Sequence, residues 1–283
     1  MDESVIQPMV LNNSTLQVKL QKLRDFVSNY SSVIVAYSGG IDSSLLALVT
    51  TELLGKQNSL IITAKSPSVN SKELEYATSL AQKNDWNHKI IQTSEFQNQS
   101  YRDNKADRCY YCKTELYSLL ESICDDKGYE VVFNGTNFDD LSDYRPGLKA
   151  ADEKNIVSPL LECRINKLEV REIAKELALE NWDKPAQPCL SSRVPYGIEI
   201  TMKILKQIED AENYLSELGF VNFRVRNHGS IARIELSEND LHRIMEKDLR
   251  LKITSYLRGI GFKFVSVDLL EFQSGNLNKN LKS

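Results

Sequence analysis

The sequence has no apolar run long enough to cross a lipid bilayer, and it has only three histidines among 283 residues. The N-terminal segment, MDESVIQPMV, carries acidic residues and lacks the basic, apolar and small-residue succession of a signal peptide. These absences predict a cytoplasmic protein without a membrane partner. Cytoplasmic cysteines stay reduced, which favours metal binding or catalysis over a disulfide framework. The cysteines are Cys109, Cys112, Cys124, Cys163 and Cys189.

An excess of positive charge is also absent. The formal net charge is −4 and the pI is about 5.6, so the chain exerts no overall attraction on a polyanion. This balance counts against tRNA as the substrate, and no nucleic-acid partner is expected. The length, with 41% hydrophobic and 26% charged residues, is typical of a globular chain with one large domain and a smaller one.

The first two thirds of the chain alternate between strand-like and helix-like segments. Residues 32–62 have the pattern strand, turn, helix, turn, strand. The alternation continues as helix, strand, helix, strand and helix over 71–84, 88–93, 113–128, 130–136 and 167–180. Such alternation predicts an α/β fold with an open, mostly parallel sheet, in a domain that we place at residues 1–185.

A stretch with three prolines, KPAQPCLSSRVPYG, separates this domain from a smaller α+β domain, placed at residues 186–283. The pattern predicts an amphipathic helix over 201–218 and two strands within 223–236, around an Asn-His-Gly-Ser turn. A second helix and a closing strand within 262–270 are expected to follow.

A glycine turn joins the first strand to the first helix of the alternating region. In VIVAYSGGIDSS, the strand runs into Ser38, Gly39 and Gly40, and a helix is expected to begin near Asp42. Glycines allow close approach of a ligand, and the unpaired amides at a helix start suit a phosphate. No GK[ST] follows, so this is not a Walker A loop. The alternative is an ordinary tight turn capped by Asp42.

A second polar segment follows a later strand, at residues 133–153. Gly135 and Thr136 stand at the strand end, where α/β sheets bind ligands. Acidic residues and an arginine come next, at Asp139, Asp140, Asp143 and Arg145. The segment is either an acidic surface loop or, beside the glycine turn, the edge of a nucleotide and magnesium site.

Cys109 and Cys112 have the CxxC spacing, which redox pairs, zinc sites and iron–sulfur sites all use. A zinc site would require a fourth ligand, and no histidine is near a cysteine in the sequence. A redox pair would follow a strand directly, whereas this pair follows a polar stretch. A pair of inert thiols at a helix start is also possible. Cys124 and Cys163 stand among apolar residues and are expected to be packed.

Four segments of the chain together resemble one protein family. SGGIDSS resembles the PP-loop of ATP pyrophosphatases, a Rossmann-like class that cleaves ATP between its α- and β-phosphates. With GTNFDDLSDYRPGLKA, PCLSSRVPYG and RVRNHGSIARIEL, the chain resembles the LarE family of ATP-dependent sulfur insertases from about residue 17 to about residue 275.

The resemblance implies ATP and Mg²⁺ as cofactors and pyridinium-3,5-biscarboxylic acid mononucleotide as the substrate. A carboxylate would be adenylated and converted to a thiocarboxylate, a step in the biosynthesis of a nickel-pincer nucleotide cofactor. The family also implies a homo-oligomer, with the C-terminal domain contributing to the substrate site and to the subunit interface.

The resemblance further implies roles for individual residues. Cys189 would be catalytic, and Cys109, Cys112 and Cys189 would hold a [4Fe-4S] cluster that takes sulfide from a separate donor. In another branch of the family the cysteine at the position of Cys189 gives up its own sulfur. Glu212 matches an acidic position of the family, and Ser191 adjoins the binding segment. The cofactor-binding residues would be Ala36, Ser38, Gly39, Gly40, Asp42, Ser43, Ser44, Ala64, Gly135, Arg145, Ser192, Arg193, Arg224 and Arg226.

Two of these arginines are weak signals without the family. Arg224 and Arg226 are two residues apart on an expected strand, so they share one face, which could simply be solvated. Two other functions are alternatives to the sulfur insertase. One is a tRNA-thiolating PP-loop enzyme, which would require a basic RNA-binding surface, and the other is a nucleotide-binding sulfur carrier without turnover.

Overall fold

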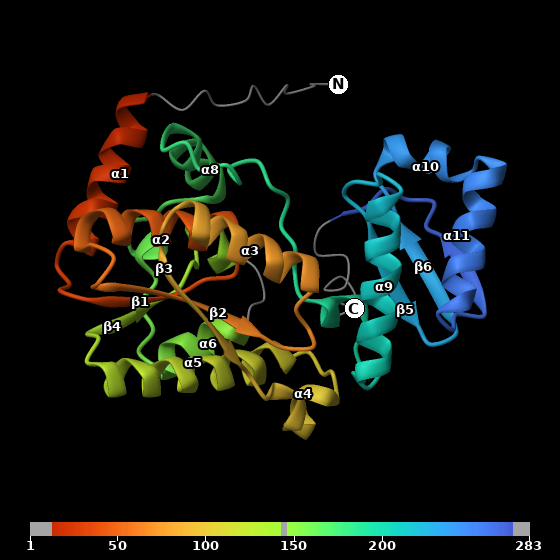
Figure 1. Ribbon diagram of the computed structural model, residues 1–283, viewed down its shortest axis with the longest axis horizontal. Helices are drawn as coiled ribbons and strands as arrows, with labels where there is room; N and C mark the ends of the chain where they lie inside the picture. The colour runs from red at the N-terminus through yellow and green to blue at the C-terminus, as the bar shows by residue number, and fades with distance from the viewer. Residues whose placement is uncertain (1–12, 143–145, 274–283) are drawn as a thin grey trace, which may run out of the picture.

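A computed structural model describes residues 13–142 and 146–273 of the chain, with the elements shown in Figure 1. Asp143 and Arg145 of the expected nucleotide edge lie outside these residues. The first sheet has four strands, β1 (Val33–Ala36), β2 (Ser59–Lys65), β3 (Asn87–Gln92) and β4 (Val131–Phe133). Its helices are α1 (Asn13–Val27), α2 (Ile41–Leu54), α3 (Ser71–Lys83), α4 (Gln99–Arg102), α5 (Arg108–Lys127), α6 (Pro146–Glu153), α7 (Pro159–Glu162) and α8 (Lys167–Glu176), with 3₁₀ turns η1 (Glu95–Gln97) and η2 (Phe138–Ser142).

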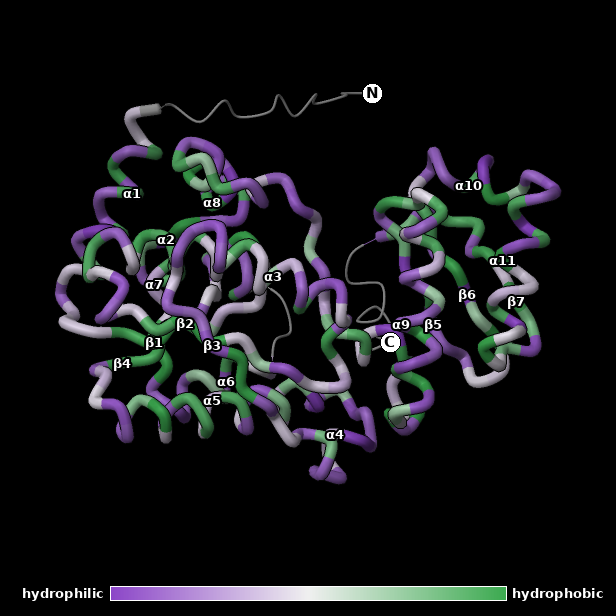
Figure 2. Tube along the Cα trace, viewed as in Figure 1, coloured by the Kyte–Doolittle hydropathy of each residue, from purple (hydrophilic) through white to green (hydrophobic). Residues whose placement is uncertain are grey.

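The four strands form a parallel sheet in the order β3-β2-β1-β4, which confirms the predicted α/β fold. Successive β1 residues face opposite sides, because strand side chains alternate. Val33 and Val35 pack with α1, α2 and α8, whereas Ile34 packs with α5 and α6. Figure 1 shows these two helical layers on either side of the sheet. In Figure 2, β1 and β4 are mostly hydrophobic, and the helices above and below them alternate between hydrophobic and hydrophilic residues.

A second sheet lies in the C-terminal part of the chain. It contains β5 (Arg224–His228), β6 (Ile231–Glu235) and β7 (Phe264–Val267), with β5 antiparallel and β7 parallel to β6. Helices α9 (Met202–Glu217), α10 (Glu238–Ile244) and α11 (Lys247–Gly259) accompany it, after a 3₁₀ turn η3 (Leu190–Arg193). Residues from these helices and strands form a hydrophobic core of their own. The division of the chain after residue 185 stays a prediction.

Several expected boundaries differ from the structure. Helix α5 begins at Arg108 and not at residue 113, so Cys109 lies in its first turn and Cys112 at the start of its second. A tertiary contact extends the helix, because the buried Arg108 guanidinium donates to Asn104 Oδ1 and, at 2.8 Å, to the Ser191 carbonyl. Two helices, α10 and α11, stand where one was expected between β6 and β7. Among the described helices none is both long and apolar enough to span a membrane.

Candidate active site

The glycine turn lies at the carboxyl edge of the first sheet, between β1 and α2. Gly39 has φ +77°, and a Cβ on it would lie 2.8 Å from the Cβ of Ala77, so the position requires glycine. Gly40 is the N-cap of α2 and makes no side-chain capping bond. Ser43 and Ser44 each donate a hydroxyl hydrogen bond of 3.0 Å to the Gly40 carbonyl. The turn therefore presents a helix N-terminus without a side-chain cap, the arrangement that binds phosphate.

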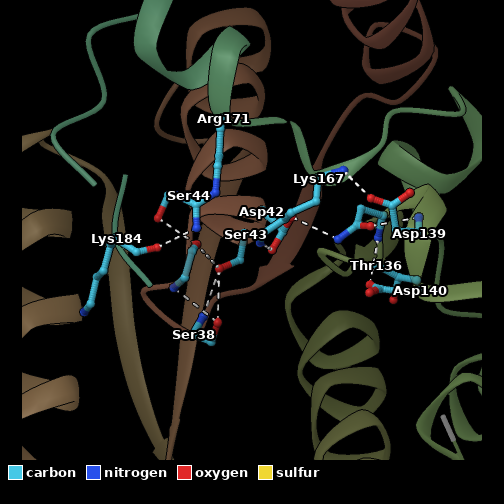
Figure 3. A network of polar contacts seen from close by, with 12 residues as sticks. Ser38, Asp42, Ser43, Ser44, Thr136, Asp139, Asp140, Lys167, Arg171 and Lys184 are labelled. Carbon is cyan, nitrogen blue, oxygen red and sulfur yellow. Dashed lines mark hydrogen bonds and ion pairs between the residues drawn. The ribbon is translucent and has the colours of Figure 1, made fainter. Parts of the chain in front are cut away.

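Asp42 does not cap the helix, so the alternative of an Asp42-capped turn is wrong. Its carboxylate pairs with Lys167 and accepts a 3.1 Å hydrogen bond from Asn137 Nδ2. Asp139 accepts a 2.9 Å hydrogen bond from the Lys167 amide, and this links η2, α8 and the start of α2 (Figure 3). The acidic segment is thus joined to the glycine turn. It is not an isolated surface loop.

Gly135 brings the end of β4 against the start of α2. A Cβ at this position would lie 2.9 Å from the Ser43 amide nitrogen, so a side chain would displace the helix start. The Thr136 amide donates to Asn134 Oδ1 at 3.0 Å, which turns the chain away from the strand. These contacts place the two polar segments of the sequence next to each other.

A cavity of about 590 Å³ opens beside the glycine turn and extends to the C-terminal unit. Sequence-predicted site residues from both parts of the chain line it: Ala36, Ser38, Ala64, Cys109, Cys112, Cys189, Arg193 and Arg224. Other predicted residues lie outside its lining: Gly39, Gly40, Asp42, Ser43, Ser44, Gly135, Ser192 and Arg226. Of these, the residues around Gly40 form the helix start described above, and Arg226 and Ser192 support the loop around Cys189.

Three cysteines share this cavity, although Cys189 is 77 residues beyond Cys112 in the sequence. Cys109 is exposed and Cys112 is half-buried, and desolvation by the surrounding protein raises the pKa of both thiols, more strongly for Cys112; the charge of Cys189 contributes to both increases. The three sulfurs are therefore electrostatic neighbours. Cys124 and Cys163 are buried in hydrophobic clusters, as predicted.

The described residues contain no group of three His, Cys, Asp or Glu side chains that could hold a metal ion. This arrangement disfavours the zinc alternative, in which all ligands converge on one ion. The same finding leaves the expected [4Fe-4S] cluster a prediction, although its three cysteines line one cavity.

Two cations accompany the three thiols, and sequence analysis did not select them. Arg108 is 3% exposed, lines the cavity and lowers the pKa of Cys109, in opposition to burial. Its Nε is buried without a hydrogen-bond partner among the described residues. Lys113 also lines the cavity, and its pKa is raised by Tyr117 and then by the cysteines. Within the described ranges neither cation has a carboxylate partner, and two such cations beside three thiols suit an anionic group. The sequence does carry one signal for these two residues, because they stand directly before and after the CxxC pair.

Arg193 holds the loop that carries Cys189. Its guanidinium makes a bidentate pair with Glu212, at 3.0 and 2.9 Å, and both side chains are buried. The same guanidinium donates to the carbonyls of Pro188 and Cys189, at 2.5 and 3.1 Å. Ser191 uses its hydroxyl in a 2.6 Å bond with Tyr101. The Cys189 loop is thus fixed by buried polar contacts to both parts of the chain.

Arg224 and Arg226 are both buried, so the alternative of a solvated strand face is wrong. Arg226 pairs with Glu235 at 2.8 Å and donates to the Ser192 carbonyl at 2.7 Å, which makes it a support for the loop. Arg224 donates only to carbonyl groups and pairs with no carboxylate in the described chain. Burial, with the charge of Arg193, lowers its pKa to about 10. Arg224 is therefore a cavity-lining cation available to an anion.

The segment before Cys189 contacts the glycine turn directly. Asn181 donates to the Gly39 carbonyl at 3.2 Å and to Ser44 Oγ at 2.8 Å. Arg171 donates to the Trp182 carbonyl and to the Lys184 carbonyl, and Figure 3 shows Arg171 and Lys184 beside the start of α2. The Lys184 ammonium pairs with Glu73 at 2.6 Å, and both side chains line the cavity. No local sequence signal indicates these long-range contacts.

The fold and this site define a PP-loop α/β protein with a nucleotide site and a thiol-lined cavity. The family model described as NAD synthase matches residues 15–113. Over 268 residues the chain is 37% identical to the pyridinium-3,5-bisthiocarboxylic acid mononucleotide synthase of Lactiplantibacillus plantarum, covering 95% of this chain and 96% of that protein.

Two further relatives have no assigned function. One, from Synechocystis sp., is 45% identical over 94% of this chain and 99% of its own length, and one from Methanocaldococcus jannaschii is 36% identical over 86% and 91%. With similarity to the synthase over nearly the full length of both proteins, the chain belongs to the LarE family of ATP-dependent PP-loop enzymes.

Proposed function

We propose that this protein is an ATP-dependent sulfur transferase that converts a carboxylate of pyridinium-3,5-biscarboxylic acid mononucleotide to a thiocarboxylate. One observation carries the proposal: the strand end at the PP-loop and three cysteine thiols line the same cavity. A nucleotide site alone would serve many reactions, and a thiol cluster alone would not require ATP. Their combination suits activation of an acid followed by attack of sulfur.

In the first step, the amides at the start of α2 bind the phosphates of ATP, with Mg²⁺ as the expected counter-ion. A carboxylate oxygen of the substrate attacks the α-phosphorus, and the bond to the β-phosphate oxygen breaks. The products are the acyl adenylate and pyrophosphate. This activation is necessary because a carboxylate oxygen is a poor leaving group, whereas AMP is a good one.

In the second step, hydrosulfide attacks the acyl carbon and the bond to the AMP oxygen breaks. The products are the thiocarboxylate, AMP and one proton. No oxidant or reductant is required. Arg224 is the cavity cation that suits the substrate phosphate or its second carboxylate, because a guanidinium offers two parallel donors.

Cys109, Cys112 and Cys189 would hold a [4Fe-4S] cluster. The buried Arg108 and the exposed Lys113 beside them suit its negative charge, and the Nε of Arg108, which has no hydrogen-bond partner among the described residues, leaves a donor for a cluster or bound sulfide. When bound, a cluster with three protein ligands supplies an iron with an open position for hydrosulfide. The loop contacts of Arg193 would keep Cys189 in position during sulfur transfer.

The test is made on protein purified without oxygen and reconstituted with iron and sulfide. Iron, acid-labile sulfide, substrate-dependent pyrophosphate and thiocarboxylate are measured for the wild type and for Cys112→Ser and Cys189→Ser. Cys124→Ser is the control, because Cys124 is buried in a hydrophobic cluster outside the cavity. We expect the cluster to be lost in the first two variants and retained in the control.

Each step of the proposal would be contradicted by a different result. Pyrophosphate release that does not depend on the pyridinium substrate would overturn the adenylation step. Absence of iron in the reconstituted wild type, with one thiocarboxylate formed per chain, would make Cys189 the sulfur donor itself. Salt-dependent binding of tRNA would instead favour a tRNA-thiolating enzyme. A cytoplasmic location, a homo-oligomer and a separate sulfide donor are parts of this proposal.

A further inference from the structure

Glu95, the first residue of η1, is a buried carboxylate on the wall of the cavity. The residue is 2% exposed, and among the described residues its carboxylate accepts one hydrogen bond, of 3.1 Å from the Ser68 hydroxyl. Two other glutamates line the cavity, and each pairs with a cation: Glu73 with Lys184 and Glu212 with Arg193. In the described part of the chain, Glu95 is therefore the cavity-lining glutamate that pairs with no cation.

The missing cation affects the free energy of the buried Glu95 carboxylate. Removing a carboxylate from water is costly, and one neutral hydroxyl does not replace the lost hydration. No cation of the described chain forms an ion pair with Glu95, although Arg108 and Lys113 line the same cavity, so a cation brought by a ligand would pair with this carboxylate directly. Glu95 therefore suits a ligand that carries positive charge into the cavity.

Glu95 lies near Cys112 and near the loop that carries Cys189. Its charge contributes, after burial, to the raised pKa of Cys112. Its partner Ser68 accepts, through the backbone carbonyl, a 2.8 Å hydrogen bond from the amide of Leu190, the residue after Cys189. Glu95 thus lies on the side of the cavity where the cysteines of α5 and the Cys189 loop meet.

We propose that Glu95 is the counter-ion of the pyridinium ring and orients the substrate for sulfur transfer. This assignment rests on the proposed function. The ring is the cationic part of that substrate, whereas its carboxylates and phosphate are anionic. The reacting carboxyl carbon is bonded directly to the ring, so the ring lies beside the cysteines when that carbon reaches the sulfur. Glu95 and Arg224 would then bind opposite charges on one molecule.

The test compares two forms of one ligand by equilibrium binding to the full-length protein with a non-hydrolysable ATP analogue. One form is pyridinium-3,5-biscarboxylic acid mononucleotide, and the other is its 1,4-dihydropyridine, which has a neutral ring and the same anionic groups. The wild type should prefer the pyridinium form. Glu95→Gln should reduce this preference by about tenfold to a hundredfold, with binding of the neutral form unchanged.

Two variants complete the design. Glu95→Asp keeps the charge and should restore part of the preference. Glu115→Gln is the matched control, because the Glu115 carboxylate accepts from the Ser94 amide beside Glu95 but does not line the cavity. It should retain the wild-type preference.

The outcomes separate the two proposals. If Glu95→Gln keeps the preference, or weakens both forms equally, Glu95 is not the counter-ion and the proposed function stands. If the wild type binds neither form, the substrate proposal fails and the Glu95 assignment fails with it.

Discussion

Gly39 and Gly55 offer a test of how tightly the PP-loop is packed. Both have nearly the same φ, +77° and +79°, in the region where a residue with a side chain is strained. A Cβ at Gly39 would lie 2.8 Å from the Ala77 Cβ and 3.2 Å from its Cα, whereas a Cβ at Gly55 would meet nothing within 4 Å. Replacement of either glycine by alanine therefore introduces backbone strain, and only Gly39 adds a collision.

The expected losses of unfolding free energy follow from backbone strain and from the collision with Ala77. Backbone strain should destabilise Gly55→Ala by about 1–3 kcal/mol. Overpacking should add about 1–3 kcal/mol for Gly39→Ala. In thermal unfolding each kcal/mol corresponds to about 2–4 °C for a domain of this size. Substrate-dependent pyrophosphate release should be lost in Gly39→Ala, because the collision moves the phosphate-binding turn, and retained in Gly55→Ala.

A third variant separates collision from strain. Ala77→Gly removes the nearest atom but leaves the backbone of α3 in place, so Gly39→Ala with Ala77→Gly should recover part of the lost stability. The coupling between the two changes should be about 1 kcal/mol, as for residues that touch each other. Equal unfolding midpoints for Gly39→Ala and Gly55→Ala, or strictly additive effects in the double variant, would refute the reasoning.

Two further predictions concern stability. Glu212→Gln should destabilise the protein by about 3–5 kcal/mol in thermal unfolding, because it leaves the buried Arg193 charge unpaired, whereas Glu217→Gln in an exposed pair should change stability by less than about 1 kcal/mol. Equal effects would contradict a role for burial. Burial lowers the pKa of His88 below its usual 6.5, so the unfolded chain binds the proton more readily and stability falls as pH decreases through that value. His88→Gln should remove this part of the pH dependence between about pH 7 and 5, measured by unfolding midpoints, and an unchanged profile would contradict it.

Local patterns predicted much of the fold. The strand, glycine turn and helix over 32–62 were predicted correctly, because short apolar, β-branched runs and glycine turns are local features of the sequence. Asn166 and Glu169 form the expected capping box at the start of α8. The start of α5 was missed, since Arg108 enters that helix through a contact with the Ser191 carbonyl, 83 residues away.

The candidate site was predictable only in part. The resemblance selected the residues of the glycine turn and Cys189, because these belong to short motifs. It did not select Glu95, which is buried and forms no ion pair in the described part of the chain, whereas Glu73 and Glu212 on the cavity wall are paired. Pairing of this kind depends on side chains from distant elements.

The α/β alternation and the need for glycine between β1 and α2 follow from the local sequence, since hydrophobic periodicity and backbone geometry act over a few residues. The folded chain was needed to show that Cys189 shares a cavity with Cys109 and Cys112. It was also needed to show that Arg193 pairs with Glu212, while Arg224 pairs with no carboxylate in the described chain. The packing of whole helices and strands determines which distant side chains form ion pairs. These pairs in turn determine the charge of the cavity and the reactivity of its thiols.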